Sequence, residues 1–440
     1  MAVALYALYQ YLLPKPIAGI PYNPAATQSM LGDIPAMLKN PLFQLFITPF
    51  SKPIVVVTDF REAQDLLMRR KEFDRSDFSI ALLGGESPNF HINLKSGQEW
   101  KSHQRLLQDL MTPRFLSGVA VPNIYQSATK LIDLLKQKAR VADGRPFSAE
   151  KDIYFAALDA VLDSGFGTPV DFLVARPHES IEATLAIGDL VQDVADSGFV
   201  KLAWWSKGFQ PHERKLRNMR AEFLREQASH AVEKLQRESD EENESCVKCA
   251  VDLVVQRERS FAKKEGCEPV YWSLAMKDED AHAEALVEKR APTHDEITKA
   301  KIPYLDAVIE EILRLGHNVP VVDRQCTQDT VILGHHIPEG THVFSPNFGP
   351  SFTSPPTEID EALRGETSQL AAKERGIRSW PVNDMEVFRP ERWLMQDEQT
   401  SNEVYNATAG PTIPFGLGPR SCFGRKLAYL ELRLLISLII

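Results

Sequence analysis

The sequence contains little cysteine and no excess of positive charge. Its five cysteines are an odd and sparse set for 440 residues, which is typical of a protein kept in a reducing compartment. Cys246 and Cys249 have metal-ligand spacing, but no second pair follows, so we expect no zinc site there. The formal net charge is −10, and no basic stripe offsets it. We therefore expect no nucleic-acid partner, because such binding needs clustered positive charge.

Long apolar runs are also absent. The apolar N-terminal stretch 1–13 is stopped by Pro14-Lys15-Pro16, whereas a membrane-spanning helix needs about 20 residues. The stretch is compatible with a shortened membrane anchor, an interfacial segment or a buried arm, and a proline-rich hinge follows it. We treat 1–24 as this apolar segment with its hinge.

A single cysteine stands in a glycine-rich loop near the C-terminus. Residues 414–424 read Pro-Phe-Gly-Leu-Gly-Pro-Arg-Ser-Cys-Phe-Gly, and leucines at helical spacing over 427–438 predict a helix after them. Cys422 therefore precedes a helix N-terminus, where unpaired N–H groups and the helix dipole stabilise a thiolate.

The other residues of this loop suit a large, flat, anionic ligand. Glycines at 416, 418 and 424 let the backbone come close to such a ligand, and Arg420 can neutralise an anionic group beside it. A thiolate ligand to haem iron needs such a loop. Two alternatives are a phosphate cradle, for which no surrounding strand–GxGxxG–helix unit is found, and a buried cysteine that only fills apolar space.

The loop resembles a known signature. Phe415, Gly418, Arg420, Cys422 and Gly424 match, residue for residue, the haem-binding signature of the cytochrome P450 monooxygenases. The resemblance implies that Cys422 is the axial ligand of the iron, that the other four residues bind the cofactor, and that Arg420 meets a propionate. It also implies haem b as cofactor and electrons from NADPH through an NADPH-cytochrome reductase. The reaction would insert one oxygen atom from O2 into a lipophilic small molecule, as in filamentous-fungal secondary metabolism.

Two further stretches carry the resemblance. Residues 304–316 predict a helix in which Glu311 and Arg314 are three positions apart and share a face. Arg392 lies in a downstream Phe-Arg-Pro-Glu-Arg-Trp segment that the family also has. In the resembled fold these three charges form a buried network that locks the cysteine loop to the core. A lone Glu-x-x-Arg is usually a surface pair, so the order of all three signatures supports the identification.

Three more residues are expected to bind the cofactor. The stretch 97–107 resembles the family helix that carries Trp and, four residues on, Arg toward a propionate; here Trp100 is present, but Arg105 stands one position late. Arg105 can substitute only if the helix is rotated or if its long side chain wraps round the helix. His103 is an alternative donor. Arg324 stands where members have a second propionate-binding arginine. The alternatives are a core aromatic for Trp100 and a strand-edge cation for Arg324.

The implied fold is mainly α, of the α+β type: a cytochrome P450-like domain over 25–440 with a large helical part and a small β-rich part. A strand at 54–57 and a capped helix at 59–70 begin the β-rich part. Further amphipathic helices are predicted over 123–138, 150–164, 181–194 and 213–238, and short strands over 320–326, 331–334 and 342–344.

One family element is missing from the sequence. Members have a long central helix with a small-Gly-x-acid-Thr motif beside the iron, but no glycine occurs between Cys267 and Leu315, and 279–290 is short and strongly charged. We predict a gap in the family pattern there and a truncation after 440, so no catalytic residue is identified. Thr298 is interpreted as part of an exposed helix opening. The alternative function is an impaired remnant or mis-spliced form that at most binds haem.

The resemblance also implies a cellular location. Family members of this kind lie on the cytosolic face of the endoplasmic reticulum membrane, so membrane association is expected by resemblance. Because the apolar part of 1–24 is too short to span a bilayer, a cytoplasmic protein is the alternative.

Overall fold

The computed structural model divides the chain into two compact units, which we describe separately. The first contains Met1–Ser96, Val194–Ala203 and Ile302–Cys422, and the second contains Gly97–Asp193, Trp204–Lys301 and Phe423–Ile440. Most of the N-terminal segment 1–24 and all of the stretch 279–290 lie outside the described residues. The described residues are 16–21, 41–46, 52–85, 90–165, 167, 173, 179–197, 199–238, 249–265, 293–317, 319–397 and 402–439.

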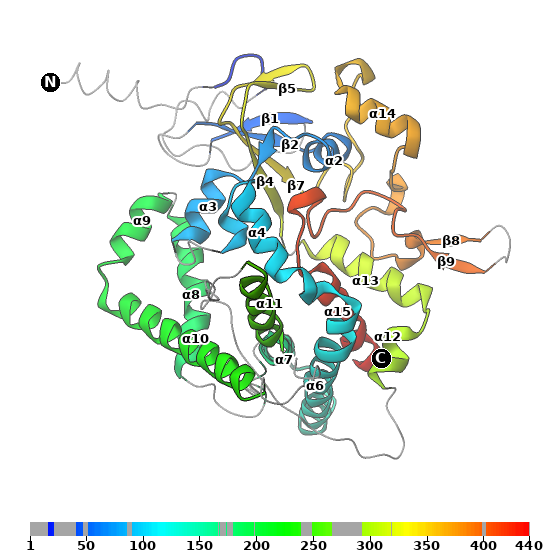
Figure 1. Ribbon diagram of the computed structural model, residues 1–440. Coiled ribbons are helices and arrows are strands. Elements are labelled where there is room, and N and C mark those ends of the chain that lie inside the picture. Colours follow the sequence, from blue (N-terminus) through cyan, green and yellow to red (C-terminus); the bar gives the residue numbers. More distant parts are fainter. Residues whose placement is uncertain are drawn as a thin grey trace. The chain divides into compact units, whose positions relative to one another are not determined.

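A five-stranded sheet in the order β1-β2-β7-β4-β3 forms the centre of the first unit (Figure 1). Its strands are β1 (Leu42–Leu45), β2 (Ile54–Val57), β3 (Phe73–Asp74), β4 (Val321–Cys326) and β7 (His342–Pro346). The β-branched residues of β2 suit a sheet interior, and Val55 and Val57 are fully buried. In the pairing of β3 with β4, Asp74 lies opposite Gln325. This register places the chain that leaves β3 beside Arg324.

A hairpin replaces part of one predicted strand. The expected strand over 331–334 is shorter and starts earlier, because β5 (Thr330–Ile332) turns at Leu333 and Gly334 into β6 (His335–Ile337). Both turn residues have positive φ, 48° and 78°. Two consecutive residues of this kind form the tight turn that matches the twist of paired strands. A second pair consists of β8 (Leu394–Gln396) and β9 (Glu403–Tyr405).

Helices α2, α3, α13 and α14 belong to the first unit. The predicted capped helix is confirmed as α2 (Phe60–Met68), where the side chain of Asp59 accepts a hydrogen bond from the Glu62 N–H at 2.9 Å. Helix α13 (Pro303–Gly316) is also confirmed, but His317 rather than Gly316 takes the left-handed conformation that ends it. Helices α3 (Asp77–Gly84) and α14 (Glu366–Arg375) were not predicted.

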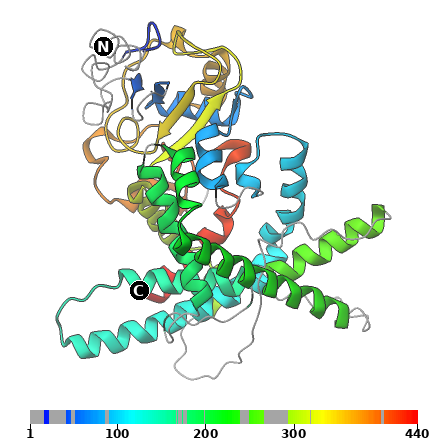
Figure 2. The same ribbon diagram turned by 90° about the vertical axis from the view of Figure 1, so that its left-hand side faces the viewer.

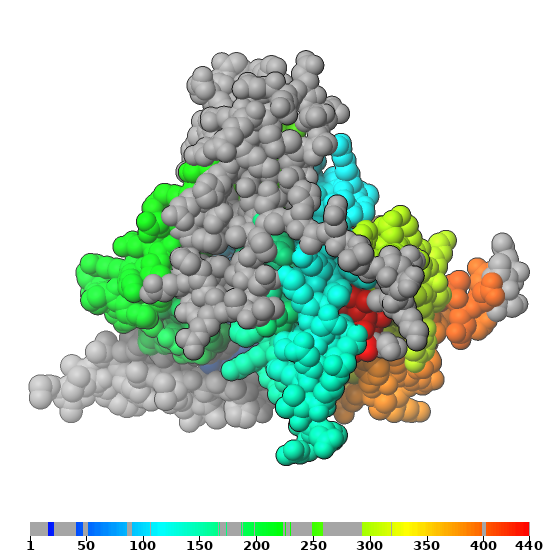
Figure 3. Space-filling model, turned by 90° about the horizontal axis from the view of Figure 1, so that it is seen from below, coloured from blue at the N-terminus to red at the C-terminus, as the bar shows by residue number. Residues whose placement is uncertain are grey.

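The second unit is helical, and each of its predicted helices is present. Helices α6 and α7 lie side by side (Figure 2). The leucines of α15 pack into one apolar cluster with α6, and the end of α15 is the small red area in Figure 3. Its helices include α4 (Gln98–Leu107), α5 (Pro113–Phe115), α6 (Val121–Ala142), α7 (Glu150–Gly165), α10 (Pro211–Glu238), α11 (Ala250–Glu265), α12 (His294–Lys299) and α15 (Arg425–Ile439).

Two further helices complete this description. Helices α8 (Glu179–Asp196) and α9 (Val200–Lys207) each continue from one unit into the other along the chain. Thr293 and Glu296 form a reciprocal capping box at the start of α12. Within α12, the Thr298 hydroxyl donates to the His294 carbonyl at 2.8 Å, as expected for part of a helix opening.

In the parts of the chain that the structure describes, no helix combines the length and apolar character needed to cross a membrane.

Candidate functional site

The cysteine loop is shaped by two glycines and one backbone hydrogen bond. Gly416 and Gly418 have φ values of 65° and 71°, which favour glycine. A Cβ atom at Gly418 would lie 2.2 Å from the Leu67 carbonyl oxygen, so no larger residue fits between the loop and the end of α2. The Cys422 N–H donates to the Phe415 carbonyl at 2.8 Å and folds the loop back on itself. Phe415 and Gly418 therefore shape the turn that presents Cys422.

The thiol of Cys422 is accessible. Among the cysteines of the described residues, Cys249 and Cys326 are buried, whereas Cys422 is exposed. A cysteine that only filled apolar space would be buried, so this alternative for Cys422 is wrong. An accessible sulfur can serve as a metal ligand.

Arg420 ties the loop to the segment that joins β3 to α4. Its Nη2 group donates to the Asp74 carboxylate and to the Leu94 carbonyl, each at 2.8 Å. Its Nε group donates to the Ser96 hydroxyl at 3.2 Å. Its guanidinium thus has protein partners while it lies next to two further arginines.

Arg75, Arg324 and Arg420 form a cluster of positive charge, which we call the arginine cluster. Arg324 is 2% exposed, and its Nη2 atom is buried without a hydrogen-bond partner. Burial and, after it, the charge of Arg75 lower the pKa of Arg324 to about 10. The Nε atom of Arg75 is likewise buried and unpartnered, and burial lowers the pKa of this arginine too. Two buried cations with unused N–H groups are costly unless an anion joins them.

The acids beside the arginine cluster are already engaged. Burial alone would raise the pKa of Asp74, but hydrogen bonds from the Ser96 and Arg75 N–H groups at 2.7 and 2.8 Å help to lower it. Asp323 accepts hydrogen bonds from the hydroxyls of Ser76 and Ser79. The cluster therefore has N–H groups left for an outside carboxylate. The haem propionates carry such carboxylates, so these residues fit the cofactor that the cysteine loop implies.

The carboxylate of Glu311 is the centre of a buried charge network. Arg314 donates to it through Nε and Nη2 at 2.8 Å each, and Arg392 donates through Nε at 3.0 Å. The Trp393 ring N–H and the Arg389 backbone N–H add bonds of 3.0 and 2.9 Å. Burial would raise the pKa of Glu311, but these donors lower it. The structure thus brings together the three charges that the sequence placed in one network.

The network binds several segments of the first unit to one another. Arg314 also donates to the backbone carbonyls of Phe352 and Met385, at 3.0 and 2.6 Å. The guanidinium carbons of Arg314 and Arg392 lie 5.7 and 5.4 Å from the Trp380 ring centre. Cations at this distance from an aromatic face are attracted to it.

The remaining predicted residues belong to the second unit. Trp100 is half-buried on α4, and Arg105 is exposed on the same helix. A Cβ atom at Gly424 would meet no atom within 4 Å, so the protein itself does not require glycine there. Contacts of these three residues with a cofactor stay predictions.

Sequence reasoning missed Arg75, Asp74 and Ser96. Asp74 is part of β3, and Arg75 and Ser96 come after it in the chain. The strand has only two residues, so no alternating pattern reveals it. The available signal was local: Ser76 has the residue type of a helix cap, and its side chain accepts the Ser79 N–H at 3.0 Å. That signal locates α3, but it does not predict that Arg75 lies beside Arg324.

Comparison with known proteins decides the family. The sequence model of the family described as "Cytochrome P450" matches residues 37–272, 275–349 and 380–440. The chain belongs to the cytochrome P450 family. Its fold, mainly helical with a small β-rich part, agrees with that assignment. Membership of this family accounts for the glycine pattern of the loop, so the alternative of a phosphate cradle is no longer needed to explain it.

Three relatives match nearly the whole chain. Cytochrome P450 monooxygenase TRI13 of Fusarium sporotrichioides is 35% identical over 100% of this chain and 92% of its own length. Cytochrome P450 monooxygenase GME11363 of Pestalotiopsis microspora is 33% identical over 100% of this chain and 91% of its own. Cytochrome P450 monooxygenase xilC of Penicillium rubens is 32% identical over 100% of this chain and 89% of its own length.

These similarities establish the general chemistry of this cytochrome P450. It is a monooxygenase, an oxidoreductase whose cofactor is haem b. Its electrons come from NADPH through a reductase, and it acts on a small molecule. The function class and the cofactor expected from the sequence are thus confirmed, and so is a reductase as redox partner; an NADPH-cytochrome reductase as that partner stays a prediction.

Proposed function

We propose that this cytochrome P450 inserts one oxygen atom from O2 into a lipophilic small molecule in the secondary metabolism of a filamentous fungus. The observation that carries the proposal is the accessible thiol of Cys422 beside an arginine cluster with unused buried N–H groups. The fungal sources of the three monooxygenase relatives support the metabolic setting.

The roles of the cofactor-binding residues are part of this proposal. Haem ligated by a thiolate supplies the capacity to cleave the O–O bond. Cys422 would provide the thiolate, and Phe415 and Gly418 would hold its loop in shape. Arg324 would donate its orphaned Nη2–H to a propionate, and Arg75 would donate through Nε. Arg420 would meet a propionate as well, while it holds Asp74 and the Leu94 carbonyl beside this site.

Additional contacts are proposed from the second unit. Trp100 and Arg105 would donate N–H groups to the cofactor from α4, as the family helix does. Gly424 would leave room for the flat face of the ring, because a side chain there has no other neighbour. The Glu311 network would keep the segment around Arg392 fixed while the cofactor enters.

Location is proposed by family resemblance alone. Many eukaryotic cytochromes P450 lie on the endoplasmic reticulum membrane, and we propose the cytosolic face of this membrane for the present enzyme. Fractionation of fungal cells that express the tagged chain tests this: the protein should sediment with microsomes. Recovery in the cytosolic supernatant would favour the alternative.

Isotope labelling tests the reaction directly. The haem-loaded enzyme, reconstituted with an NADPH-cytochrome reductase, is incubated with ¹⁸O2 and a panel of lipophilic fungal metabolites. Mass spectrometry should show a product that contains one ¹⁸O atom and depends on NADPH. Omitting the reductase is the control. An NADPH-dependent product whose new oxygen atom carries no ¹⁸O, and therefore comes from water, would contradict the proposal if haem loading is full.

A second candidate function is favoured by one observation. The alignment with the Fusarium monooxygenase extends over 543 residues and includes all of this chain, which has 440, so the relative contains stretches without a counterpart here. The family match is also interrupted between 272 and 275. We propose, as this second candidate, a form that binds haem but cannot activate oxygen. Normal haem loading without any labelled product would support it.

A further inference from the structure

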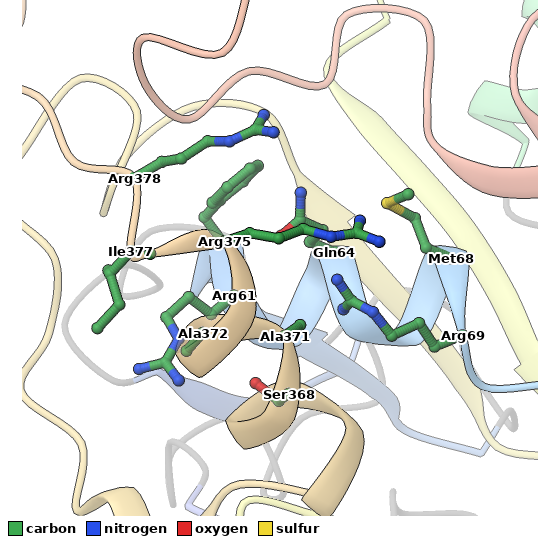
Figure 4. A pocket seen from close by; sticks show the side chains of 12 residues that line it. Arg61, Gln64, Met68, Arg69, Ser368, Ala371, Ala372, Arg375, Ile377 and Arg378 are labelled. Carbon is green, nitrogen blue, oxygen red and sulfur yellow. The ribbon is translucent and has the colours of Figure 1, made fainter.

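A small pocket lies between α2 and α14 of the first unit (Figure 4). Its volume of about 60 Å³ is far below the ~300 Å³ at which pockets for drug-sized ligands begin. The pocket is strongly basic, because every residue of its lining that titrates is an arginine. These are Arg61, Arg69, Arg375 and Arg378.

Two of the four arginines are neutralised by the protein. Arg61 makes a two-bond pair with the Glu361 carboxylate, at 2.7 and 2.9 Å. Arg69 pairs with Asp65 at 3.0 Å. Arg375 and Arg378 have no ion pair with any of the residues that the structure describes. The pocket therefore carries two positive charges without a counter-charge.

Three of the four arginine side chains lie around Gln64 (Figure 4). In Figure 4, Arg375 extends from α14 across the pocket toward α2, and Arg69 extends back from the end of α2. Gln64 lies beside them, and Arg378 lies on the other side of Gln64. Arg61 points away at the far end, where Glu361 holds it. An ion beside Gln64 would thus face Arg69, Arg375 and Arg378.

We propose that this pocket binds a phosphate group through Arg69, Arg375 and Arg378. A phosphate monoester carries a charge of about −1.5 to −2 at pH 7, which matches the two uncompensated guanidinium groups. Guanidinium groups donate paired N–H bonds to phosphate oxygens with good geometry, and the amide of Gln64 can add a further donor. Inorganic phosphate and the phosphate of a small metabolite share this chemistry, and the small volume restricts the bound part to the phosphate itself.

The charges of Arg375 and Arg378 lie close enough to repel each other. Burial lowers the pKa of Arg378, and the charge of Arg375 lowers it further. The C-terminal ends of α2 and α14 account for some of the basic character, because cations are favourable there. That effect applies to Arg69 and Arg375, but Arg378 lies three residues beyond the end of α14. A bound dianion accounts for all three.

Arg375 and Arg378 lie in a part of the chain that the family match does not cover. The stretches that match the family end at 349 and resume at 380, so all of α14 and both unpaired arginines lie outside them. Helix α14 is attached to α2 by the Thr367 hydroxyl, which donates to Asp65 at 2.7 Å. The inference does not depend on haem binding or on the proposed substrate.

Binding is tested by calorimetric titration of the full-length protein with inorganic phosphate and with phenyl phosphate, at ionic strength kept constant with NaCl. The double variant Arg375→Gln/Arg378→Gln should weaken binding at least about tenfold, because two charge-assisted contacts are lost. Arg61→Gln is the matched control, and binding should change less than about twofold, since this arginine is held by Glu361. Far-UV circular dichroism verifies that both variants are folded.

The two probes distinguish the sources of the phosphate. Binding of both probes would assign the pocket to a phosphorylated metabolite, and binding of inorganic phosphate alone would assign it to the free ion. No saturable heat with either probe would overturn the proposal, as would equal affinity in the double variant. Loss of reductase affinity in the double variant, without phosphate binding by the wild type, would overturn it in favour of an acidic protein partner.

Discussion

The first unit buries two groups of arginines that differ in how their N–H groups are used. In the Glu311 network, Arg314 and Arg392 share one carboxylate and give their other N–H groups to further protein acceptors. In the arginine cluster, Arg75 and Arg324 each keep a buried N–H group without a partner, and their pKa values are lowered. Both groups therefore consist of arginines and acids, but the N–H groups have protein acceptors in the Glu311 network, whereas some in the arginine cluster have none.

This difference separates a structural role from a binding role. A saturated network stabilises the folded chain by itself, and removing one member leaves the others as unpaired buried charges. A cluster with unused buried N–H groups lowers the stability of the haem-free protein. Binding of an anion that accepts hydrogen bonds from these groups removes this cost. Mutations should therefore affect folding at the Glu311 network and haem retention at the arginine cluster.

The largest effect is expected for Glu311→Ala. The change leaves Arg314 and Arg392 buried without their shared carboxylate, which should destabilise the fold by about 3–5 kcal/mol. Urea unfolding followed by circular dichroism measures this loss of stability. Recovery of the variant only as insoluble protein would have the same meaning. Glu391→Ala is the control, because Glu391 is exposed and accepts a single bond from Tyr304. Soluble, haem-loaded Glu311→Ala protein with normal stability would remove the distinction between the two groups.

Arg324→Met should weaken haem binding without lowering the stability of the haem-free protein. Loss of a charge-assisted hydrogen bond to a propionate, worth about 1.5–3 kcal/mol, should weaken haem binding about 10- to 100-fold. The haem-free protein should be as stable as wild type or more so, because an unpaired buried charge is removed. Haem titration and urea unfolding of the haem-free protein measure the two quantities. A large loss of stability with unchanged haem affinity would place Arg324 in a structural role.

Asp74→Asn should give a smaller, pH-dependent effect. The pKa of Asp74 is lowered from 3.8 in the folded state, so its ionised form stabilises the fold above pH 3.8, and that contribution is lost as pH falls through the folded pKa. The variant should be less stable at pH 7 by about 1–2 kcal/mol. The difference should shrink as the pH is lowered to about 3. Unfolding curves from pH 3 to 7 test this, and a difference that is independent of pH would contradict the sign.

The smallest effect is expected for Arg389→Ala. The side chain of Arg389 pairs with Asp384 but is 54% exposed, and exposed pairs contribute little. The link of residue 389 to Glu311 is its backbone N–H, which alanine keeps. The urea midpoint should therefore stay close to that of the wild type. A shift as large as that of Glu311→Ala would show that the network extends into its exposed edge.

Sequence patterns predicted the elements that bury apolar residues at regular spacing. Helix α15 is an example, because its leucines at 427, 430, 434 and 438 share one apolar cluster. Helix α14 was not predicted, since Ser368 is its only buried residue and no apolar stripe reveals it. The turn at Leu333 was missed because a residue other than glycine takes a positive φ there.

The candidate site could be predicted only where a family signature marks it. Cys422 and the Glu311 network were found because their motifs are fixed in spacing. Arg75 was not, because its role depends on the pairing of the two-residue strand β3 with β4, which no local pattern specifies. The phosphate pocket was missed for a similar reason, since α2 and Arg378 are far apart in the sequence.

The absorption spectrum of the dithionite-reduced protein with carbon monoxide tests the central claim most directly. The wild type and the control Cys326→Ala, whose sulfur is buried and donates to the Pro338 carbonyl, should show the strongly red-shifted Soret band of thiolate-ligated haem. Cys422→Ala should lose that band. An unchanged band in Cys422→Ala, or no haem in soluble wild-type protein supplied with haem precursor, would contradict the assignment of Cys422 as the iron ligand.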